Sequence, residues 1–270
     1  MVDAAGRKGL GETLRELWAF RDTTMAFAER DVRIKYKQTA LGIGWAILQP
    51  VATVAIFAFA FGHVSHISGA GVPYAAFALS ALVPWTFLQT AVTFSAESLL
   101  TQVSLVRKVY FPRETVVLGA VLACVLDLGI GLILFVVAGP ALGAQVSVTW
   151  LLAPILTIPL LALAAGVGLI FAGLTAYYRD ARYALPFLVQ LWLFASPVAY
   201  PLSFLSPSAR WVVVALNPAA GVLDSISRVL TAGTLPTPAY LSVSVAGCLV
   251  TLLVGYTVLK RLEPRIADVI

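Results

Sequence analysis

Asp127 is the first side chain to consider for chemistry, because it is the one charged residue between Thr115 and Tyr178. A carboxyl group in such an apolar stretch has two uses. It can face a bundle interior or a water-filled path, where ionisable groups in membrane segments are usually found. It can also be protonated and hydrogen-bonded as part of the structure. The sequence leaves both interpretations open for Asp127.

Other reactive residue types are sparse and poorly placed for catalysis. Asp224 and Arg228 are four residues apart and can pair on one helical face; for them too, a structural and a functional interpretation stay open. The two histidines, His63 and His66, are close together between apolar runs, where solvated imidazoles are expected rather than metal ligands. No phosphate-binding glycine-lysine motif occurs. The sequence therefore predicts no catalytic or metal site.

The two cysteines, Cys124 and Cys248, both lie within apolar runs. Such cysteines are typical small buried hydrophobes. We expect neither a disulfide nor a metal pair from them.

Two short clusters combine charge with aromatic rings. The first runs from Arg107 to Glu114 and places Tyr110 and Phe111 among basic residues; the second is Tyr177-Tyr178-Arg179-Asp180. Exposed aromatics flanked by arginine suit insertion into the groove of a partner protein. Basic residues with aromatics are equally typical of a membrane anchor at the lipid headgroups. Both clusters admit either interpretation.

The elements that position these residues follow from where charge is missing. No Asp, Glu, Lys or Arg occurs between Gln38 and Ala96 or between Val229 and Leu259, and 60% of all residues are hydrophobic against 11% charged. A helix needs about 20 apolar residues to cross the hydrocarbon core. The pattern excludes an ordinary soluble domain and, lacking short alternating segments, a β-barrel. The net charge of +5 does not indicate nucleic-acid binding, because the basic residues flank apolar runs.

We therefore predict an all-α polytopic membrane protein with six transmembrane helices. The expected spans are Gly44–Gly62, Tyr74–Phe94, Val116–Ala138, Trp150–Ala176, Ala184–Pro201 and Leu241–Leu259. Trp211–Ala232 contains Asn217-Pro218 and charged residues, so we expect a re-entrant pair of half-helices there, covered by protein. Residues 1–37 form one unit and residues 38–270 the transmembrane domain.

Loop charges predict the orientation. Sixteen of the eighteen Lys and Arg residues fall on one side of these spans, and Arg210 and Arg228 are the exceptions. Because cytoplasmic loops carry an excess of Lys and Arg, both termini are expected in the cytoplasm. About forty mixed residues precede the first apolar run, so no cleavable signal is expected.

The N-terminal unit is expected to hold an amphipathic helix from Leu10 to Val32. Leu14, Trp18, Met25 and Val32 recur on one face. One interpretation is a helix lying in the membrane interface on the cytoplasmic side. The other is an ordinary solvated helix packed on a neighbouring domain.

A series of motifs resembles the ABC-2 type permeases that export polysaccharides, a group that includes O-antigen, teichoic-acid and capsule transporters. The motifs occur in family order along nearly the whole chain. They are Arg33-x-Lys35-Tyr36-Lys37-Gln38-Thr39-x-Leu41-Gly42-x-x-Trp45, Gln49-Pro50, Val106-Arg107-Lys108-Val109-x-Phe111-Pro112-Arg113-Glu114, Tyr178-Arg179-Asp180, Ser196-Pro197-Val198-x-Tyr200 and Asn217-Pro218.

The resemblance implies a homodimeric permease in the inner membrane of a bacterium, with two copies of a separate ATP-binding cassette subunit. ATP and Mg²⁺ would be bound by that subunit, so no cofactor is expected in this chain and the chain is not itself an enzyme. A lipid-linked glycan would be the substrate, with membrane lipid as the surroundings and no nucleic-acid partner. We expect no glycan-recognising extension in the C-terminal residues Lys260–Ile270.

The resemblance also implies roles for residues. Coupling to the ATPase would involve Arg107, Lys108, Tyr110, Phe111, Pro112, Arg113, Glu114, Tyr178, Arg179 and Asp180. The entrance gate at the membrane interface would involve Arg33, Lys35, Tyr36, Lys37 and Trp45. The translocation path would be lined by Phe57, Phe61, Trp192 and Phe194 of the first and fifth spans, and Asp127 is the candidate acid for this path.

Other functions share parts of this pattern. An ABC-2 permease for a drug or lipid would have the same architecture. A membrane-embedded acyl- or glycosyltransferase would need convergent acid and base groups, which the sequence does not offer around Asp127. A channel or assembly factor would work without an ATPase partner.

Overall fold

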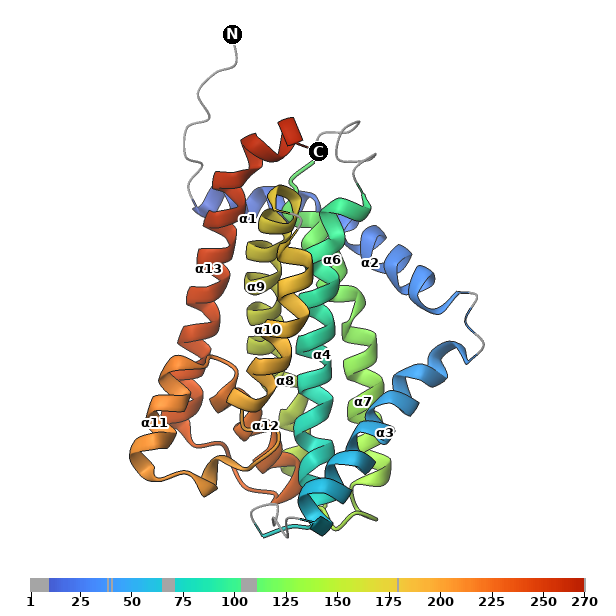
Figure 1. The fold of residues 1–270 in the computed structure, drawn as a ribbon, viewed down its shortest axis with the longest axis vertical. Helices are drawn as coiled ribbons and strands as arrows, with labels where there is room; N and C mark the ends of the chain where they lie inside the picture. The colour runs from blue at the N-terminus through green and yellow to red at the C-terminus, as the bar shows by residue number, and fades with distance from the viewer. Residues whose placement is uncertain are drawn as a thin grey trace.

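The computed structural model describes residues 10–37, 39, 41–64, 71–102, 111–178 and 180–269. Within these ranges every regular element is a helix, which confirms the predicted all-α membrane architecture. The long helices stand side by side along the long axis of the molecule (Figure 1). The N-terminal helix α1 and the end of the last helix, α13, lie at the same end of this bundle.

Five helical segments are long and apolar enough to cross a membrane, and they correspond to predicted spans one to four and six. The first joins η1 (Gly42–Gly44), α3 (Trp45–Phe57) and the π-helix η2 (Ala58–Val64). The others are α4 (Tyr74–Thr101), α6 (Glu114–Ala123) with α7 (Val125–Ala138), η3 (Val148–Leu152) with α8 (Ala153–Leu156) and α9 (Ile158–Tyr177), and α13 (Pro238–Val269).

The predicted fifth span is shorter than expected. Helix α10 covers Ala181–Ala195, and its 15 residues give a length of about 22 Å at 1.5 Å per residue, below the ~30 Å of a hydrocarbon core. The helix stops because Ser196, which precedes Pro197, is extended. The expectation that the span continues to Pro201 was therefore wrong.

The broken segment near the C-terminus forms two helices. The helices α11 (Pro207–Leu216) and α12 (Ala220–Thr231) meet at Asn217-Pro218 with a bend of 115°. Both lie at the end of the bundle opposite α1, close to the short helix η4 (Leu202–Phe204) (Figure 1). The prediction of two half-helices is confirmed, and the break falls where the sequence placed it.

The predicted N-terminal helix is divided in two. The chain forms α1 (Leu10–Ala19) and α2 (Arg21–Tyr36), separated at Phe20. Trp18 and Met25 point outward, with exposed fractions of 71% and 53%, while Thr24 and Ala28 are buried. Helix α2 therefore packs on the bundle along its buried side, and Trp18 and Met25 are left exposed.

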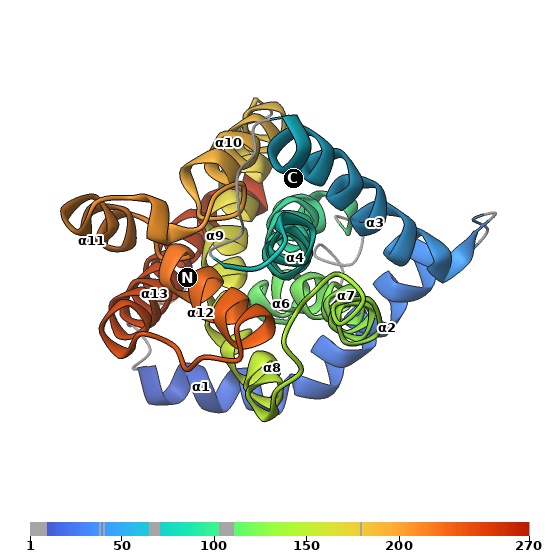
Figure 2. The same ribbon diagram turned by 90° about the horizontal axis from the view of Figure 1, so that it is seen from below.

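Glycines permit the closest helix contacts. A Cβ atom on Gly119 of α6 would lie 2.8 Å from the Cβ atom of Phe27, so α2 can approach α6 this closely because a glycine is there. In the same way a Cβ on Gly255 of α13 would lie 2.1 Å from the carbonyl oxygen of Gly166 of α9. Small residues allow such approach between membrane helices. Viewed along the bundle, α9 lies between α4 and α13 (Figure 2).

Candidate functional site

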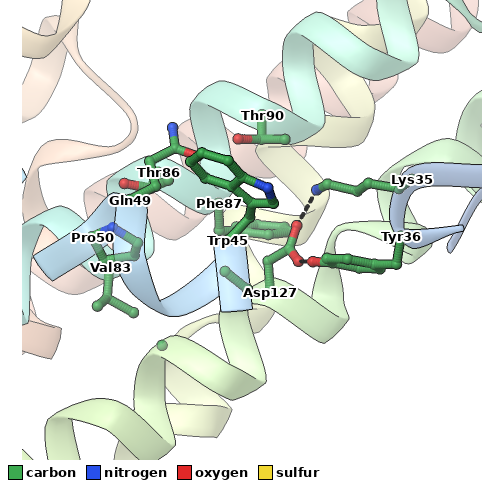
Figure 3. Close-up of a pocket in the computed structure, with 12 residues that line it drawn as sticks. Lys35, Tyr36, Trp45, Gln49, Pro50, Val83, Thr86, Phe87, Thr90 and Asp127 are labelled. Carbon is green, nitrogen blue, oxygen red and sulfur yellow. Dashed lines mark hydrogen bonds and ion pairs between the residues drawn. The ribbon is translucent and has the colours of Figure 1, made fainter. Parts of the chain in front are cut away.

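Asp127 has its partners on α2, the second helix of the chain. It lies in the first turn of α7, where its two carboxylate oxygens accept hydrogen bonds from the Lys35 ammonium and the Tyr36 hydroxyl at the end of α2 (Figure 3). An unpaired charge in a low-dielectric interior carries a penalty of several kcal/mol. The Lys35–Asp127 pair therefore neutralises two charges that neither helix could hold alone at this depth.

The end of α2 is brought to α7 by local geometry. Packing of α2 on α6 at Gly119 directs the helix along the flank of the third span. Helix α2 ends where Lys37 is extended, and Gly42 then adopts a φ of +52°, which glycine tolerates without strain. The chain turns there into α3, so Trp45 returns to the same region as Lys35 and Tyr36.

A cavity of about 200 Å³ opens beside the ion pair. It lies between α2, α3, α4 and α7 (Figure 3). The side chains that line it are Lys35, Tyr36, Trp45, Ala46, Gln49, Pro50, Val83, Thr86, Phe87, Thr90, Asp127 and Gly131. The structure thus joins residues expected at the entrance gate with the acid expected in the translocation path.

Two of the expected entrance residues lie elsewhere. The Arg33 guanidinium points outward and lies 3.7 Å from the carboxylate of Glu29 on the same helix. Lys37 is exposed at the end of α2. Both are placed at the surface and neither lines the cavity.

The aromatic residues expected in the path are spread over different environments. Phe57 and Phe61 pack against each other with ring centroids 5.5 Å apart and contact the core. The ring of Trp192 packs edge-on against Trp85. Phe194 is 55% exposed, so it is the member of this group that most fully faces away from the chain.

Trp192 is held by the hinge of the bent pair. Its indole N–H donates to the side-chain oxygen of Asn217, 2.9 Å away. The amide nitrogen of Asn217 donates to the Ala195 carbonyl oxygen and the Ser196 hydroxyl. Asn217 therefore connects the two Pro-containing motifs: it ties the end of α10 to the break between α11 and α12.

The first charged cluster is described from Phe111 onward; Arg107, Lys108 and Tyr110 lie outside the described residues, and so does Arg179 of the second cluster. The Phe111 ring packs on Phe27 of α2, with centroids 5.6 Å apart. Pro112 is buried, and its carbonyl oxygen accepts from Thr115 at the start of α6. The cluster is thus in direct contact with the N-terminal helix.

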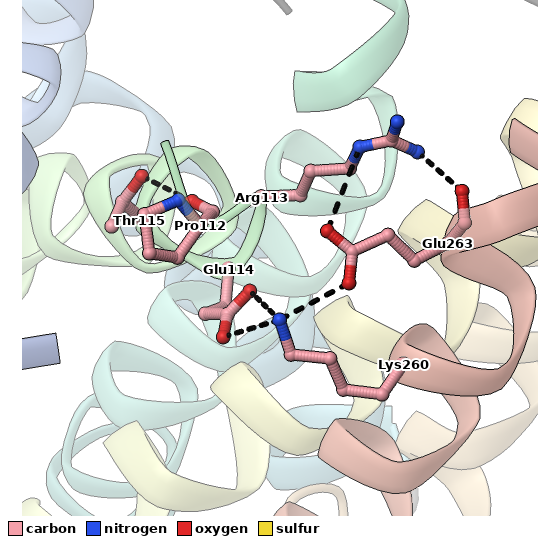
Figure 4. Close-up of polar contacts among 6 residues, drawn as sticks. All are labelled: Pro112, Arg113, Glu114, Thr115, Lys260 and Glu263. Atoms are coloured by element: carbon pink, nitrogen blue, oxygen red, sulfur yellow. Dashed lines mark hydrogen bonds and ion pairs between the residues drawn. The ribbon is translucent and has the colours of Figure 1, made fainter. Parts of the chain in front are cut away.

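Arg113 and Glu114 point toward Lys260 and Glu263 of α13 (Figure 4). The buried Glu114 carboxylate lies 3.0 Å from the Lys260 ammonium, and Lys260 also reaches Glu263 at 3.1 Å. The Arg113 guanidinium donates to the Glu263 carbonyl oxygen at 2.8 Å. Because these are charge-assisted contacts with low exposure, they clamp the start of α6 to the end of α13.

The second cluster is more exposed. Tyr178 is 58% exposed and packs edge-on against Tyr177, and Asp180 is exposed before α10. Just beyond it, the Arg182 guanidinium donates to the Glu97 carboxylate of α4 at 2.8 Å. Tyr178 and Asp180 are thus available to a partner, in contrast to Arg113 and Glu114.

One carboxyl group of α2 has a shifted pKa. Asp31 is buried against the bundle, and this burial raises its pKa, while the neighbouring Arg30 guanidinium opposes the rise. The Asp31 carboxylate accepts a hydrogen bond from Arg30 at 3.2 Å. The face of α2 that packs on the protein is therefore partly polar, which is why apolar periodicity alone did not identify it.

Three glutamines were missed by reasoning from charge. Gln49 of α3, Gln89 of α4 and Gln190 of α10 are all exposed. Gln89 lies eight residues before Glu97 on α4, and Gln190 lies eight residues after Arg182 on α10, about 12 Å in each case. Because the two helices are antiparallel, both glutamines lie on the same side of the Glu97–Arg182 pair and at a similar depth. Scanning the charge-free runs for uncharged amides would have found them.

The glutamines lie on neighbouring helices. Helices α3 and α10 flank α4 when the bundle is viewed along its axis (Figure 2). Gln89 is twelve residues from the end of α4, about 18 Å, which places it deep within the span. An amide exposed to hydrocarbon is unfavourable, so these positions are suited to contact with protein, water or a polar substrate rather than lipid.

The chain is similar to one family of membrane transporters and to several of its characterised members. The family model described as "ABC-2 type transporter" matches residues 23–230. The O-antigen export system permease protein RfbA of Myxococcus xanthus is 27% identical over 224 residues, which cover 83% of this chain and 85% of that protein. The protein of the same name from Klebsiella pneumoniae is 24% identical, covering 92% and 95%. The polysialic acid transport protein KpsM of Escherichia coli is 25% identical, covering 89% and 93%.

Proposed function

The chain belongs to the ABC-2 type transporter family, and from this premise we propose that it is the membrane permease of an ATP-driven exporter of polysaccharide. The relatives named above transport O-antigen or polysialic acid, which are both polysaccharides. Their similarity extends over more than four fifths of both chains. The substrate class follows from this shared length rather than from one short motif.

The observation that carries the proposal is the set of exposed glutamines on α3, α4 and α10. Gln49, Gln89 and Gln190 offer hydrogen-bond donors and acceptors at membrane depth, where lipid offers no partner. A chain of sugar hydroxyls is a suitable partner for such amides. We therefore place the translocation path along α3, α4 and α10, with a second copy of the chain closing it from the other side.

The finer features of the proposal come from charge and family. The Lys and Arg excess on one side supports an inner-membrane protein with both termini in the cytoplasm. The family organisation supports a homodimer that binds two ATPase subunits, and these would supply the ATP and Mg²⁺ sites. A lipid-linked glycan is the proposed form of the substrate, because a lipid anchor would hold the polymer at the membrane surface before transport.

Two contacts on α2 give a mechanical basis for coupling. Phe111, at the end of the first charged cluster, packs on Phe27, and eight residues further along α2 Lys35 binds Asp127. A helix transmits displacement along its axis, so a movement of the cluster would reach the ion pair and the cavity. ATP binding by the partner would thereby bias the permease between two states.

The test uses the natural host. Deleting the chromosomal copy should leave polysaccharide inside the cell, and the wild-type chain expressed with its ATPase should restore surface polysaccharide. An ATPase variant unable to hydrolyse ATP should not restore it. Gln89→Leu and Gln190→Leu should each lower export, whereas Val137→Leu on the exposed surface of α7 should not.

A purified complex distinguishes the remaining substrates. Polysaccharide-stimulated ATP hydrolysis is expected from the complex in lipid nanodiscs. Stimulation by a drug or a phospholipid with no response to polysaccharide would contradict the proposal. Normal surface polysaccharide after deletion of the permease would contradict it as well.

A further inference from the structure

The hydroxyl groups of α4 fall into two classes. Seven serine and threonine residues lie along this helix, and five of them donate to a backbone carbonyl oxygen of α4 itself. Thr86 and Thr90 are the other two, and the hydroxyl of neither makes a hydrogen bond to any residue that the structure describes. They are four residues apart, so they lie on one face of the helix.

That face lines the cavity beside Asp127. The Gln49 amide lines it too and has no hydrogen-bond partner among the described side chains or backbone groups. Two hydroxyls and one carboxamide thus offer donors and acceptors to the same space. Polar groups at membrane depth are satisfied by a partner in nearly all structures. The cavity is therefore suited to an occupant that forms several hydrogen bonds.

The charge of the cavity selects a neutral occupant. Its one ammonium, on Lys35, is already bound to its one carboxylate, on Asp127. An anion could bind Lys35 only by leaving Asp127 unpaired, which is strongly unfavourable in a low dielectric. A neutral molecule with many hydroxyls leaves the ion pair intact and can form hydrogen bonds with the threonine hydroxyls and the Gln49 amide.

The walls and the size narrow the class further. Trp45, Phe87 and Tyr36 add aromatic rings to the polar groups. Aromatic faces pack well against the CH groups of a sugar ring. The volume of about 200 Å³ is below that of pockets for drug-sized ligands, roughly 300–1,000 Å³, so the cavity suits one ring rather than a chain.

We propose that this cavity binds a single sugar ring of the exported glycan, through hydrogen bonds from Thr86, Thr90 and Gln49 and packing on Trp45. The inference rests on the proposed function, because it takes the polysaccharide as the substrate. It adds a defined binding position beside the ion pair that connects α2 to α7. Occupancy of this position would place the sugar in contact with the helix that reaches the ATPase side.

The test replaces hydroxyls by methyl groups of the same shape. The double variant Thr86→Val with Thr90→Val should lower export of the host polysaccharide about tenfold or more, since each lost hydrogen bond weakens binding severalfold. Its thermal stability should stay unchanged or rise, because unpaired polar groups are removed. Thr93→Val is the matched control. The Thr93 hydroxyl already donates to the Gln89 carbonyl oxygen of the same helix, so export should be unchanged.

A second measurement identifies the occupant. A photoreactive amino acid at position 49 should capture the polysaccharide in exporting cells, whereas the same probe at Phe59, which faces outward on the same span, should capture lipid. Wild-type export by the double variant, or capture of phospholipid alone at position 49, would overturn the inference. If the double variant loses both stability and export, capture of the glycan at position 49 of the otherwise unchanged protein supports the sugar site.

The two proposals fail differently. If the wild-type chain restores polysaccharide export and the double variant does so equally well, the sugar site is wrong and the permease function stands. If the wild-type chain restores no polysaccharide export, the permease function itself is wrong. The probe at position 49 can also be combined with either variant. If Lys35→Gln abolishes capture and Thr86→Val with Thr90→Val does not, the occupant is a phosphate headgroup bound by Lys35, and the sugar site is overturned.

Discussion

Lys35, one residue before the end of the second helix, forms an ion pair with Asp127 in the middle of the third span, 92 residues later. This contact joins the N-terminal helix to the transmembrane bundle at membrane depth. It also gives the Asp127 carboxylate a defined partner, which the sequence did not. The carboxylate is an anchor for α2, and through α2 it is connected to the segment at Phe111.

The ion pair can be tested by removing one or both charges. We expect Lys35→Met and Asp127→Leu each to destabilise the protein by about 1–3 kcal/mol, a value below that of a fully buried pair because both side chains are partly exposed. The double variant should regain much of that loss, since no charge is left unpaired. Thermal unfolding of the purified complex measures this, and a double variant as unstable as the sum of the singles would contradict it.

The conservative change Asp127→Asn separates structure from mechanism. The amide can still accept from Tyr36, so the complex should assemble, but Lys35 loses its counter-charge and the end of α2 its anchor. We expect export to fall while co-purification with the ATPase persists. Wild-type export from Asp127→Asn would mean that the residue has only a structural role.

The Phe27–Phe111 contact is expected to carry movement from the ATPase side to α2. Phe111→Ala and Phe27→Ala should each lower the amount of polysaccharide exported per ATP hydrolysed, because both remove the same packing. Phe59→Ala, on an outward-facing side chain, should leave this ratio unchanged. Arg107→Glu tests the neighbouring charge. Unchanged ATPase association and export in both Phe111→Ala and Arg107→Glu would rule out this coupling role.

The clamp between α6 and α13 should matter more for stability than a surface ion pair. Glu114 is 2% exposed, so Lys260→Met leaves a buried carboxylate without its main partner and should cost about 2–4 kcal/mol. Arg182→Gln, which breaks an exposed pair, should cost under ~1 kcal/mol. Denaturation of the two variants side by side checks this order, and equal losses would show that the clamp contributes little.

The Asn217 side chain should be required for the position of the bent pair. Asn217→Ala removes hydrogen bonds to Trp192, Ala195 and Ser196, and we expect a loss of about 2–3 kcal/mol because several buried groups lose a partner. The emission of Trp192 should shift as its indole N–H is released. Ser242→Ala, at an exposed hydroxyl, is the control. Unchanged stability and emission in Asn217→Ala would contradict the role of this residue as a tie.

Features that depend on the local chain were predictable from the sequence. The charge-free runs located the spans because a membrane helix must be apolar along its whole length, wherever it packs. Asn217-Pro218 located the bend, since proline disfavours a helical conformation in the residue before it. The same rule at Ser196-Pro197 would have given the true end of α10, but hydrophobicity continued beyond it and extended the predicted span to Pro201.

Features that depend on which helices meet were decided only in the tertiary structure. The sequence shows Lys35 and Asp127 as a cation and an acid in separate segments, and nothing in their spacing pairs them. It likewise placed Arg113 and Glu114 in a cluster suited to a partner, whereas the fold turns them toward Lys260 and Glu263. The reason is physical: periodicity assigns a face to each helix, but the rotation and crossing of packed helices determine which faces touch, and Gly119 and Gly255 set those approaches through contacts with distant residues.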